Sequence, residues 1–292
     1  MIFTFLHFGI IVAGLLISPG LDQQLINSLV QKNYNNSLAR STMVEYNHFA
    51  PSDENSYAKA LDSLGIIRNS GSKKTSETSE NIQNNRSLNH CKTLVFRTLK
   101  SLPPEAVSYL KNLTLQMENE GRRGWGGGST IILRCQGVSD EELVSVLVHE
   151  MGHITDTGLL KGNSSSGESE FMDGNRPVYK DDPSLEFYRI SFENDKMLKN
   201  GSSIIDFVSG YAATDPFEDF AESYNFYVLH GEEFRSVKGF NQSLQKKYNF
   251  LKTRVFGDKE FSYGDQSRKP DIFDRDYDTT VLHYDLKKFF VT

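Results

Sequence analysis

Two histidines four residues apart are the side chains whose type and spacing best suit metal chemistry. The pentapeptide HEMGH places His149 and His153 at positions i and i+4, with Glu150 beside the first of them. On a helix these histidines lie on consecutive turns of one face, so both imidazoles could bind one zinc ion. Glu150 could then accept a proton from a water molecule and later give it to a leaving amine. The alternative is two surface histidines on an amphipathic helix.

The residues around this motif predict the helix that it needs. Ser139 followed by Glu142 fits a capping box, and we expect a helix from about Asp140 to Asp156. Its apolar residues have helical spacing and form one stripe: Leu143, Val144, Leu147, Val148, Met151 and Ile154. The histidines belong to a second, polar stripe. The pattern predicts a helix that packs by one face and presents its histidines from the other.

A catalytic zinc ion needs a third protein ligand and an open position, and a second predicted helix offers candidates. Asp215 is suited to cap this helix and Pro216 to occupy its first position. Glu218 and Glu222 follow, one turn apart. If the two helices pack together, one carboxylate could reach the metal and the other could accept the distal N–H of a liganding histidine. The alternative for the pair is a solvated acidic edge.

Two stretches resemble the lethal-factor-like zinc metallopeptidases, a group of gluzincins that includes the protease domain of anthrax lethal factor. They are VLVHEMGHITD, from Val146 to Asp156, and SGYAATDPFEDFAESY, from Ser209 to Tyr224. The family pattern is HExxH, then a tyrosine seven residues before a glutamate, then Phe-Ala-Glu on the same helix. The resemblance implies an α+β, zincin-like domain with a small sheet, the HExxH helix and a second ligand helix.

The resemblance also implies a role for each residue of these motifs. The ligands of Zn²⁺ would be His149, His153 and Glu218. Glu150 would be the general base, and Glu222 would contact a liganding histidine from behind. Tyr211 would donate its hydroxyl to the oxyanion of the tetrahedral intermediate, which a phenol can do without carrying a net charge. The alternative for Tyr211 is a ring that only packs.

These observations predict a zinc-dependent endopeptidase whose partner is a protein or peptide substrate. Endopeptidase is the more natural reading because the chain has no Gly-x-Met-x-Asn exopeptidase motif. A narrowly specific effector directed at a cell wall or a host would differ only in its substrate. The reading from another class is a non-catalytic, zinc-stabilised extracytoplasmic binding module, in which the metal only ties two helices together.

The composition and the first 20 residues limit these expectations. The 292 residues, 38% of them hydrophobic, suffice for one sizeable domain with appendages, and the formal net charge of −6 argues against a nucleic-acid partner. The apolar run within residues 1–20 predicts a signal peptide or a membrane anchor, or else a buried helix. We therefore expect an extracytoplasmic protein that is secreted or tethered to a membrane through its N-terminus.

The two cysteines fit an exported protein. A disulfide between Cys91 and Cys135 would fix the entry of the domain beside the predicted zinc helix. On the chain-entropy model, such a loop closure could stabilise the fold by about 4 kcal/mol. The alternative is a pair of buried free thiols.

The remaining sequence divides into regions of different character. Residues 21–67 contain short amphipathic stretches that could be a helical pro-segment, a stalk or a docking region, and residues 68–90 are a polar linker. Residues 91–265 are the predicted zinc metallopeptidase domain. The tail, residues 266–292, has no assigned structure.

Within the predicted domain we expect a helix from Pro104 to about Asn112 and strands at 113–116 and 129–134. The second strand would lie at the lip of the cleft, where an extended substrate could add to it. The glycines at 124–128 would allow close backbone approach, or form only a turn. Further helices are expected at 185–199 and 242–256. The long loop at 157–183 would be a lid or a disordered segment.

Overall fold

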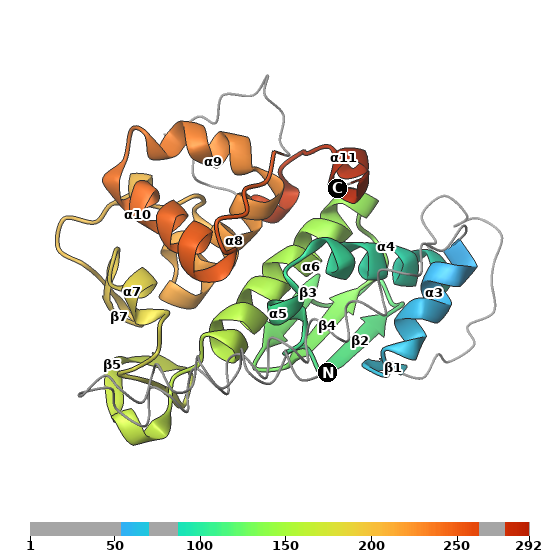
Figure 1. Cartoon of the computed structure of the whole chain (residues 1–292), viewed down its shortest axis with the longest axis horizontal. Coiled ribbons are helices and arrows are strands. Elements are labelled where there is room, and N and C mark those ends of the chain that lie inside the picture. The colour runs from blue at the N-terminus through green and yellow to red at the C-terminus, as the bar shows by residue number, and fades with distance from the viewer. Residues whose placement is uncertain (1–53, 70–86, 263–277, 292) are drawn as a thin grey trace, which may run out of the picture. The chain divides into compact units, whose positions relative to one another are not determined.

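The computed structural model describes residues 54–69, 87–262 and 278–291, and these residues form an α+β unit (Figure 1). The predicted signal peptide or anchor at residues 1–20 lies outside the described residues. Among the helices that the structure describes, none is both long enough and apolar enough to cross a membrane.

A four-stranded sheet forms one side of the unit. Its strands are β1 (Ile67–Asn69), β2 (Asn112–Gln116), β3 (Gly124–Gly127) and β4 (Thr130–Arg134), in the order β1-β2-β4-β3. β1, β2 and β4 are parallel, and β3 runs antiparallel to β4. The strands expected at 113–116 and 129–134 are confirmed. The expected place of the second strand is wrong, because β4 pairs on both sides and the glycine-rich β3 is the edge strand.

The helix that carries the HEMGH motif is α6 (Asp140–Ile154). The Oγ of Ser139 accepts a hydrogen bond from the backbone N–H of Glu142 over 3.0 Å, which confirms the predicted cap. A π-helical turn, Thr155–Leu159, follows it. The expectation that α6 packs by only one face is wrong, because Ser145 and His149 on its polar stripe are also buried, whereas Glu142 and His153 are partly exposed. Part of this face lies against α8, the second helix that the sequence predicted.

The second helix, α8 (Pro216–Leu229), packs directly on α6. The Oδ1 of Asp215 accepts hydrogen bonds from the first turn of α8, so the predicted cap is confirmed. A Cβ added to Gly152 of α6 would lie 2.8 Å from the Cα of Ala221, so the two backbones meet with no side chain between them. Asn225 donates a further bond to the carbonyl of Ser145 over 2.7 Å. These contacts fix α8 beside the histidines.

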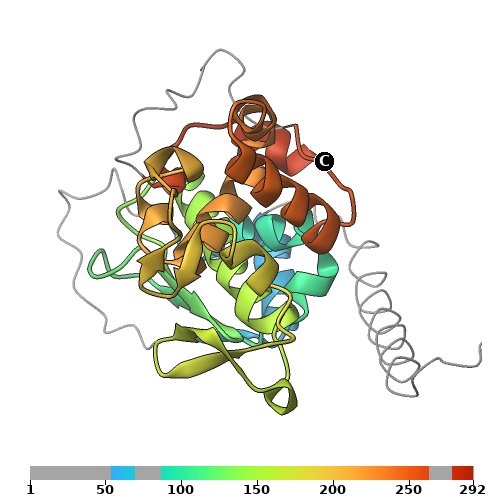
Figure 2. The same ribbon diagram turned by 90° about the vertical axis from the view of Figure 1, so that its left-hand side faces the viewer.

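The other helices flank this pair (Figures 1 and 2). Near the sheet are α3 (Glu54–Ser63), α4 (Leu88–Ser101) and α5 (Pro104–Val107). Beyond α8 are α7 (Leu185–Tyr188), α9 (Gly231–Lys238) and α10 (Gln242–Phe250), where an aromatic cluster of Phe187, Phe220 and Phe250 fills the core. In Figure 1, α6 in green runs between the sheet and the yellow to orange helices. It is the central helix of the unit.

Two hairpins occur where the sequence predicted a helix and a long loop. The expected helix at 185–199 is wrong: α7 ends at Tyr188, and β7 (Phe192–Asn194) and β8 (Met197–Leu198) follow. The Oδ1 of Asn194 accepts from the N–H of Lys196, which favours a turn over a helix. The expected loop at 157–183 contains the hairpin of β5 (Glu168–Asp173) and β6 (Arg176–Tyr179), seen at the lower end of Figure 2.

One expected helix is shorter than its sequence pattern suggested, and another is confirmed. The helix expected from Pro104 to about Asn112 ends with α5 at Val107. The N–H groups of Lys111 and Asn112 bond instead to the carbonyl of Ser129, which draws the chain into the sheet. The helix expected at 242–256 is confirmed as α10, with π-helical turns at Leu251–Val255.

The compact unit is longer than the predicted metallopeptidase domain at 91–265. On the N-terminal side β1, which lies across the expected boundary between the helical region and the linker, pairs with β2. On the C-terminal side the expected tail contains α11 (Leu286–Val291) and a 3₁₀ turn, Thr279–Val281. The hydroxyl of Tyr284 donates to the carbonyl of Glu141 over 2.9 Å. These pairings join residues far apart in sequence, which local patterns at the expected boundaries do not reveal.

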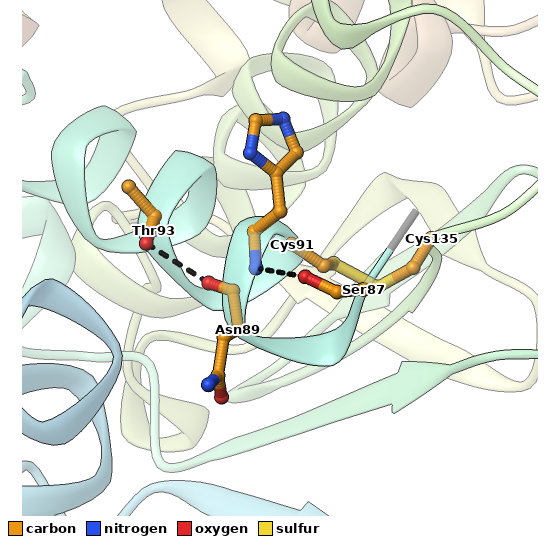
Figure 3. Close-up of a disulfide and its surroundings, with 6 residues drawn as sticks. Ser87, Asn89, Cys91, Thr93 and Cys135 are labelled. Carbon is orange, nitrogen blue, oxygen red and sulfur yellow. Dashed lines mark hydrogen bonds between the residues drawn. A yellow bond between two sulfur atoms is a disulfide. The ribbon is translucent and has the colours of Figure 1, made fainter. Parts of the chain in front are cut away.

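A disulfide joins Cys91 in the first turn of α4 to Cys135, the residue after β4 (Figure 3). Both cysteines are fully buried, with their Cα atoms 5.9 Å apart. The Oγ of Ser87 caps α4 by accepting from the N–H of His90. The bond thus ties the start of α4 to the connection that leads from the sheet into α6.

Candidate metal centre

Three potential metal ligands meet between α6 and α8. The nitrogens of His149 and His153 and a carboxylate oxygen of Glu218 all lie within 4.8 Å of one another. Oε2 of Glu218 is 3.2 Å from Nε2 of His149 and 3.4 Å from Nε2 of His153. The histidines converge because they are one turn apart on α6, and the capped first turn of α8 holds Glu218 opposite them.

The electrostatics of these groups suit a divalent cation. Burial alone would raise the pKa of Glu218, but the two imidazoles hold it well below its usual range, so the carboxylate is ionised. Burial alone would lower the pKa of His149, but the hydrogen bonds to Glu218 and Glu222 raise it well above its usual value. Oε2 of Glu218 is buried and has no hydrogen bond of good geometry among the described residues. Two imidazole nitrogens and one carboxylate oxygen form a donor set that fits zinc.

Glu222 fixes the orientation of His149. Its Oε1 lies 2.8 Å from Nδ1 of the imidazole, and the carboxylate is completely buried. With Nδ1 bonded to Glu222, Nε2 is the nitrogen that faces Glu218. The other oxygen, Oε2, accepts from the hydroxyl of Ser209 over 2.6 Å and from the N–H of Thr279 over 2.7 Å. The position of Glu222 agrees with a supporting role behind the ligands.

The sequence reasoning missed both of these donors. Ser209 belongs to the stretch SGYAATDPFEDFAESY, where its short distance from Tyr211 was the only available signal. Thr279 is 57 residues beyond Glu222, and no motif surrounds it.

Glu150 lies against the edge strand. A Cβ added to Gly126 of β3 would be 2.6 Å from Oε2 of Glu150, and one added to Gly124 would also collide with this side chain. Burial raises the pKa of Glu150, which makes its carboxylate a stronger base than an exposed one. The glycines of β3 therefore allow a close approach by Glu150, whereas their expected approach to a substrate stays a prediction.

Tyr211 stands at the rim of the same site. It begins a 3₁₀ turn, Tyr211–Ala213, just before α8, and its ring stacks over that of His149 with centroids 6.1 Å apart. The side chain is 44% exposed, so a bound molecule could reach its hydroxyl. Burial and the negative charge of Glu218 raise the pKa of Tyr211, which keeps the phenol protonated and able to donate.

A cleft of about 720 Å³ opens over this cluster. Its walls come from β3, α6, α8 and the chain around residue 279, and all six predicted metal and catalytic residues contact it. Those six are His149, Glu150, His153, Tyr211, Glu218 and Glu222. The cleft has the size of a ligand-binding site and brings together a general-base candidate, a hydroxyl donor and three potential ligands.

Comparison of the chain with models of protein families, with curated proteins and with solved structures finds no match.

Proposed function

We propose that this protein is a zinc-dependent endopeptidase of the gluzincin type, with a zincin-like domain and a lethal-factor-like active site. The observation that carries the proposal is the meeting of Glu150, Tyr211 and the three-ligand cluster of His149, His153 and Glu218 in one cleft. A metal cluster alone would support many functions. A buried carboxylate can act as the general base and a phenol beside it as an oxyanion donor, and both roles suit peptide hydrolysis.

The residues of the site have distinct tasks in this reaction. A zinc ion held by the cluster would lower the pKa of water and polarise the scissile carbonyl. Glu150 accepts the proton of the attacking water and transfers it to the departing amine. Tyr211 donates a hydrogen bond to the former carbonyl oxygen as it gains negative charge. Glu222 holds His149 in the orientation that binding requires.

The edge strand β3 supports a peptide as the substrate. One side of β3 pairs with β4, and among the described residues the other side has no partner strand. An extended peptide could therefore add to β3 along the cleft, with backbone hydrogen bonds supplying affinity. Trp125, which is 48% exposed and lines the cleft, could contact a substrate side chain. The predicted strand-addition role thus moves from residues 129–134 to β3.

A secreted or membrane-tethered protein is the setting that we propose for this activity. The disulfide between Cys91 and Cys135 supports an oxidising compartment, because such bonds are rare in the cytosol. Residues 1–20 would supply the export signal or the tether. Non-reducing mass spectrometry of the exported protein should find no free thiol. Two free thiols would contradict the expected compartment.

Incubating the zinc-loaded full chain with a diverse peptide library tests the proposed activity. We expect internal cleavage that a chelator stops and added zinc restores, and no cleavage by the Glu150→Gln variant. Cleavage confined to terminal residues would contradict the endopeptidase. A protein that binds zinc but cleaves nothing would favour the non-catalytic binding module, which has no use for Glu150 or Tyr211.

A further inference from the structure

The chain near its C-terminus returns to the candidate metal centre and bonds to the group behind it. The N–H of Thr279 donates to Oε2 of Glu222 over 2.7 Å, and both residues are fully buried. Oε1 of the same carboxylate holds Nδ1 of His149. We propose that residues 278–280 are a positioning element of the metal centre, in which the Thr279 N–H holds Glu222 and, through it, His149. This inference rests on the proposed zinc site.

Arg123 holds residues 278–280 at the edge of the cleft. Its guanidinium lies 2.6 Å from Oδ2 of Asp278 and donates to the hydroxyl of Thr280 over 2.8 Å. The same group contacts Oε1 of Glu142 on α6 over 2.9 Å. Asp278 also caps the turn by accepting from the N–H of Thr280. The segment is therefore attached both to the chain that leads into β3 and to α6.

A second set of contacts holds the chain beyond the turn. Tyr284 bonds to the carbonyl of Glu141 at the start of α6, and the guanidinium of Arg97 on α4 lies 4.0 Å from the ring centre of Phe290. Contacts on both sides of Thr279 thus fix the direction of its N–H. Such a fixed donor is suited to a carboxylate that must not move when its histidine binds a metal.

Loss of the Thr279 N–H would act on metal binding through Glu222. This carboxylate would keep the hydroxyl of Ser209 but lose one of two donors to Oε2, and no solvent reaches it to compensate. A less firmly held Glu222 orients His149 less well. Removing the outer partner of a metal ligand typically lowers affinity by about 10- to 100-fold, so loosening Glu222 without removing it should lower affinity by up to this factor.

Two substitutions at residue 279 separate the N–H from the side chain. Thr279→Pro removes both, whereas Thr279→Ala removes only the side chain, whose buried hydroxyl has no hydrogen bond among the described residues. Proline fits the first position of a helical turn, and the preceding Asp278 already has the extended backbone that proline favours, with φ −94° and ψ 160°. The two variants therefore differ chiefly in one donor.

The test is the zinc affinity of each protein, measured by competition with a chromogenic chelator, alongside circular dichroism and thermal unfolding of the metal-free forms. We expect Thr279→Ala to bind zinc as the parent does and Thr279→Pro to bind up to about 100-fold more weakly, with matching spectra and a melting temperature lowered by the lost buried hydrogen bond. Equal affinities for the two variants would overturn the inference while leaving the zinc site intact.

Arg123→Met provides the same test if Thr279→Pro does not fold. It releases Asp278 and Thr280 without touching Glu222 or a ligand, and we expect weaker zinc binding by a folded protein. Parental affinity in this variant would overturn the inference. A parent protein that binds no zinc would overturn the proposed function and, with it, the role of Thr279.

Discussion

Gly126 on β3 and Glu150 on α6 are in such close contact that a Cβ on the glycine would lie 2.6 Å from Oε2 and 2.9 Å from the backbone oxygen of Glu150. The carboxylate is thus confined between an edge strand and a helix. The confinement also buries it, and burial raises its pKa. The contact with Gly126 therefore restricts the position of the proposed general base, and burial increases its basicity.

Gly126→Ala should displace Glu150 and lower kcat, by about 10²-fold if the carboxylate moves by roughly 1 Å. Zinc content should not change, because the three atoms nearest to the added Cβ all belong to Glu150, which is not a proposed ligand. Gly127→Ala is the matched control on the same strand, since a Cβ there would meet nothing within 4 Å. Equal turnover by the two variants would show that the contact with Glu150 has no catalytic importance.

Glu150→Gln should retain zinc but lose peptide hydrolysis, because an amide has nearly the shape of the carboxylate and cannot accept the proton of water. Zinc content by elemental analysis and turnover on a cleaved library peptide measure the two effects separately. A variant that cleaves as fast as the parent would remove Glu150 from the mechanism.

Tyr211→Phe should lower turnover by about 10²-fold or more, as expected for the loss of one donor to a developing oxyanion. Its ring can still stack on His149, so metal content should stay at the parental level. Single-turnover kinetics with a cleaved peptide would measure the chemical step. An unchanged rate would mean that the tyrosine only packs.

Asp156 should make stability depend on pH. It is buried, Tyr188 donates to it over 2.6 Å, and burial raises its pKa to about 7 from an ordinary value of 3.8. The folded protein therefore keeps a proton that the unfolded chain releases, so this group's contribution to stability falls as pH rises from 3.8 to about 7. Urea unfolding of the metal-free protein should show Asp156→Asn gaining stability relative to the parent across this window. A constant difference would contradict the assigned proton.

Local signals were sufficient to predict the two helices at the centre of the site. Ser139 and Asp215 are caps that act within three residues, and the spacing of His149 and His153 is a property of any helix. The proposed ligand Glu218 follows one of these caps. The resemblance, and not a local signal, implied that Tyr211 belongs to the same site as Glu150, and both residues line one cleft.

Pairings between distant residues could not be predicted from local patterns. Arg123 and Asp278 are 155 residues apart, and neither lies in a recognisable motif. The glycines of β3 indicated that another group approaches them closely, but not which one. That group is Glu150 on α6, and β4 separates the two elements in the sequence. The helix expected at 185–199 failed because Phe192 packs on Phe207 and begins a hairpin, a tertiary contact that overrides helical spacing.

The most direct test of the central claim is anomalous scattering at the zinc absorption edge from crystals of the zinc-loaded protein. One peak should lie about 2.0–2.2 Å from Nε2 of His149, Nε2 of His153 and a carboxylate oxygen of Glu218, with a further coordination position open to the cleft. A peak bound by other residues, or no peak at saturating zinc, would contradict the claim that these three side chains form the metal site.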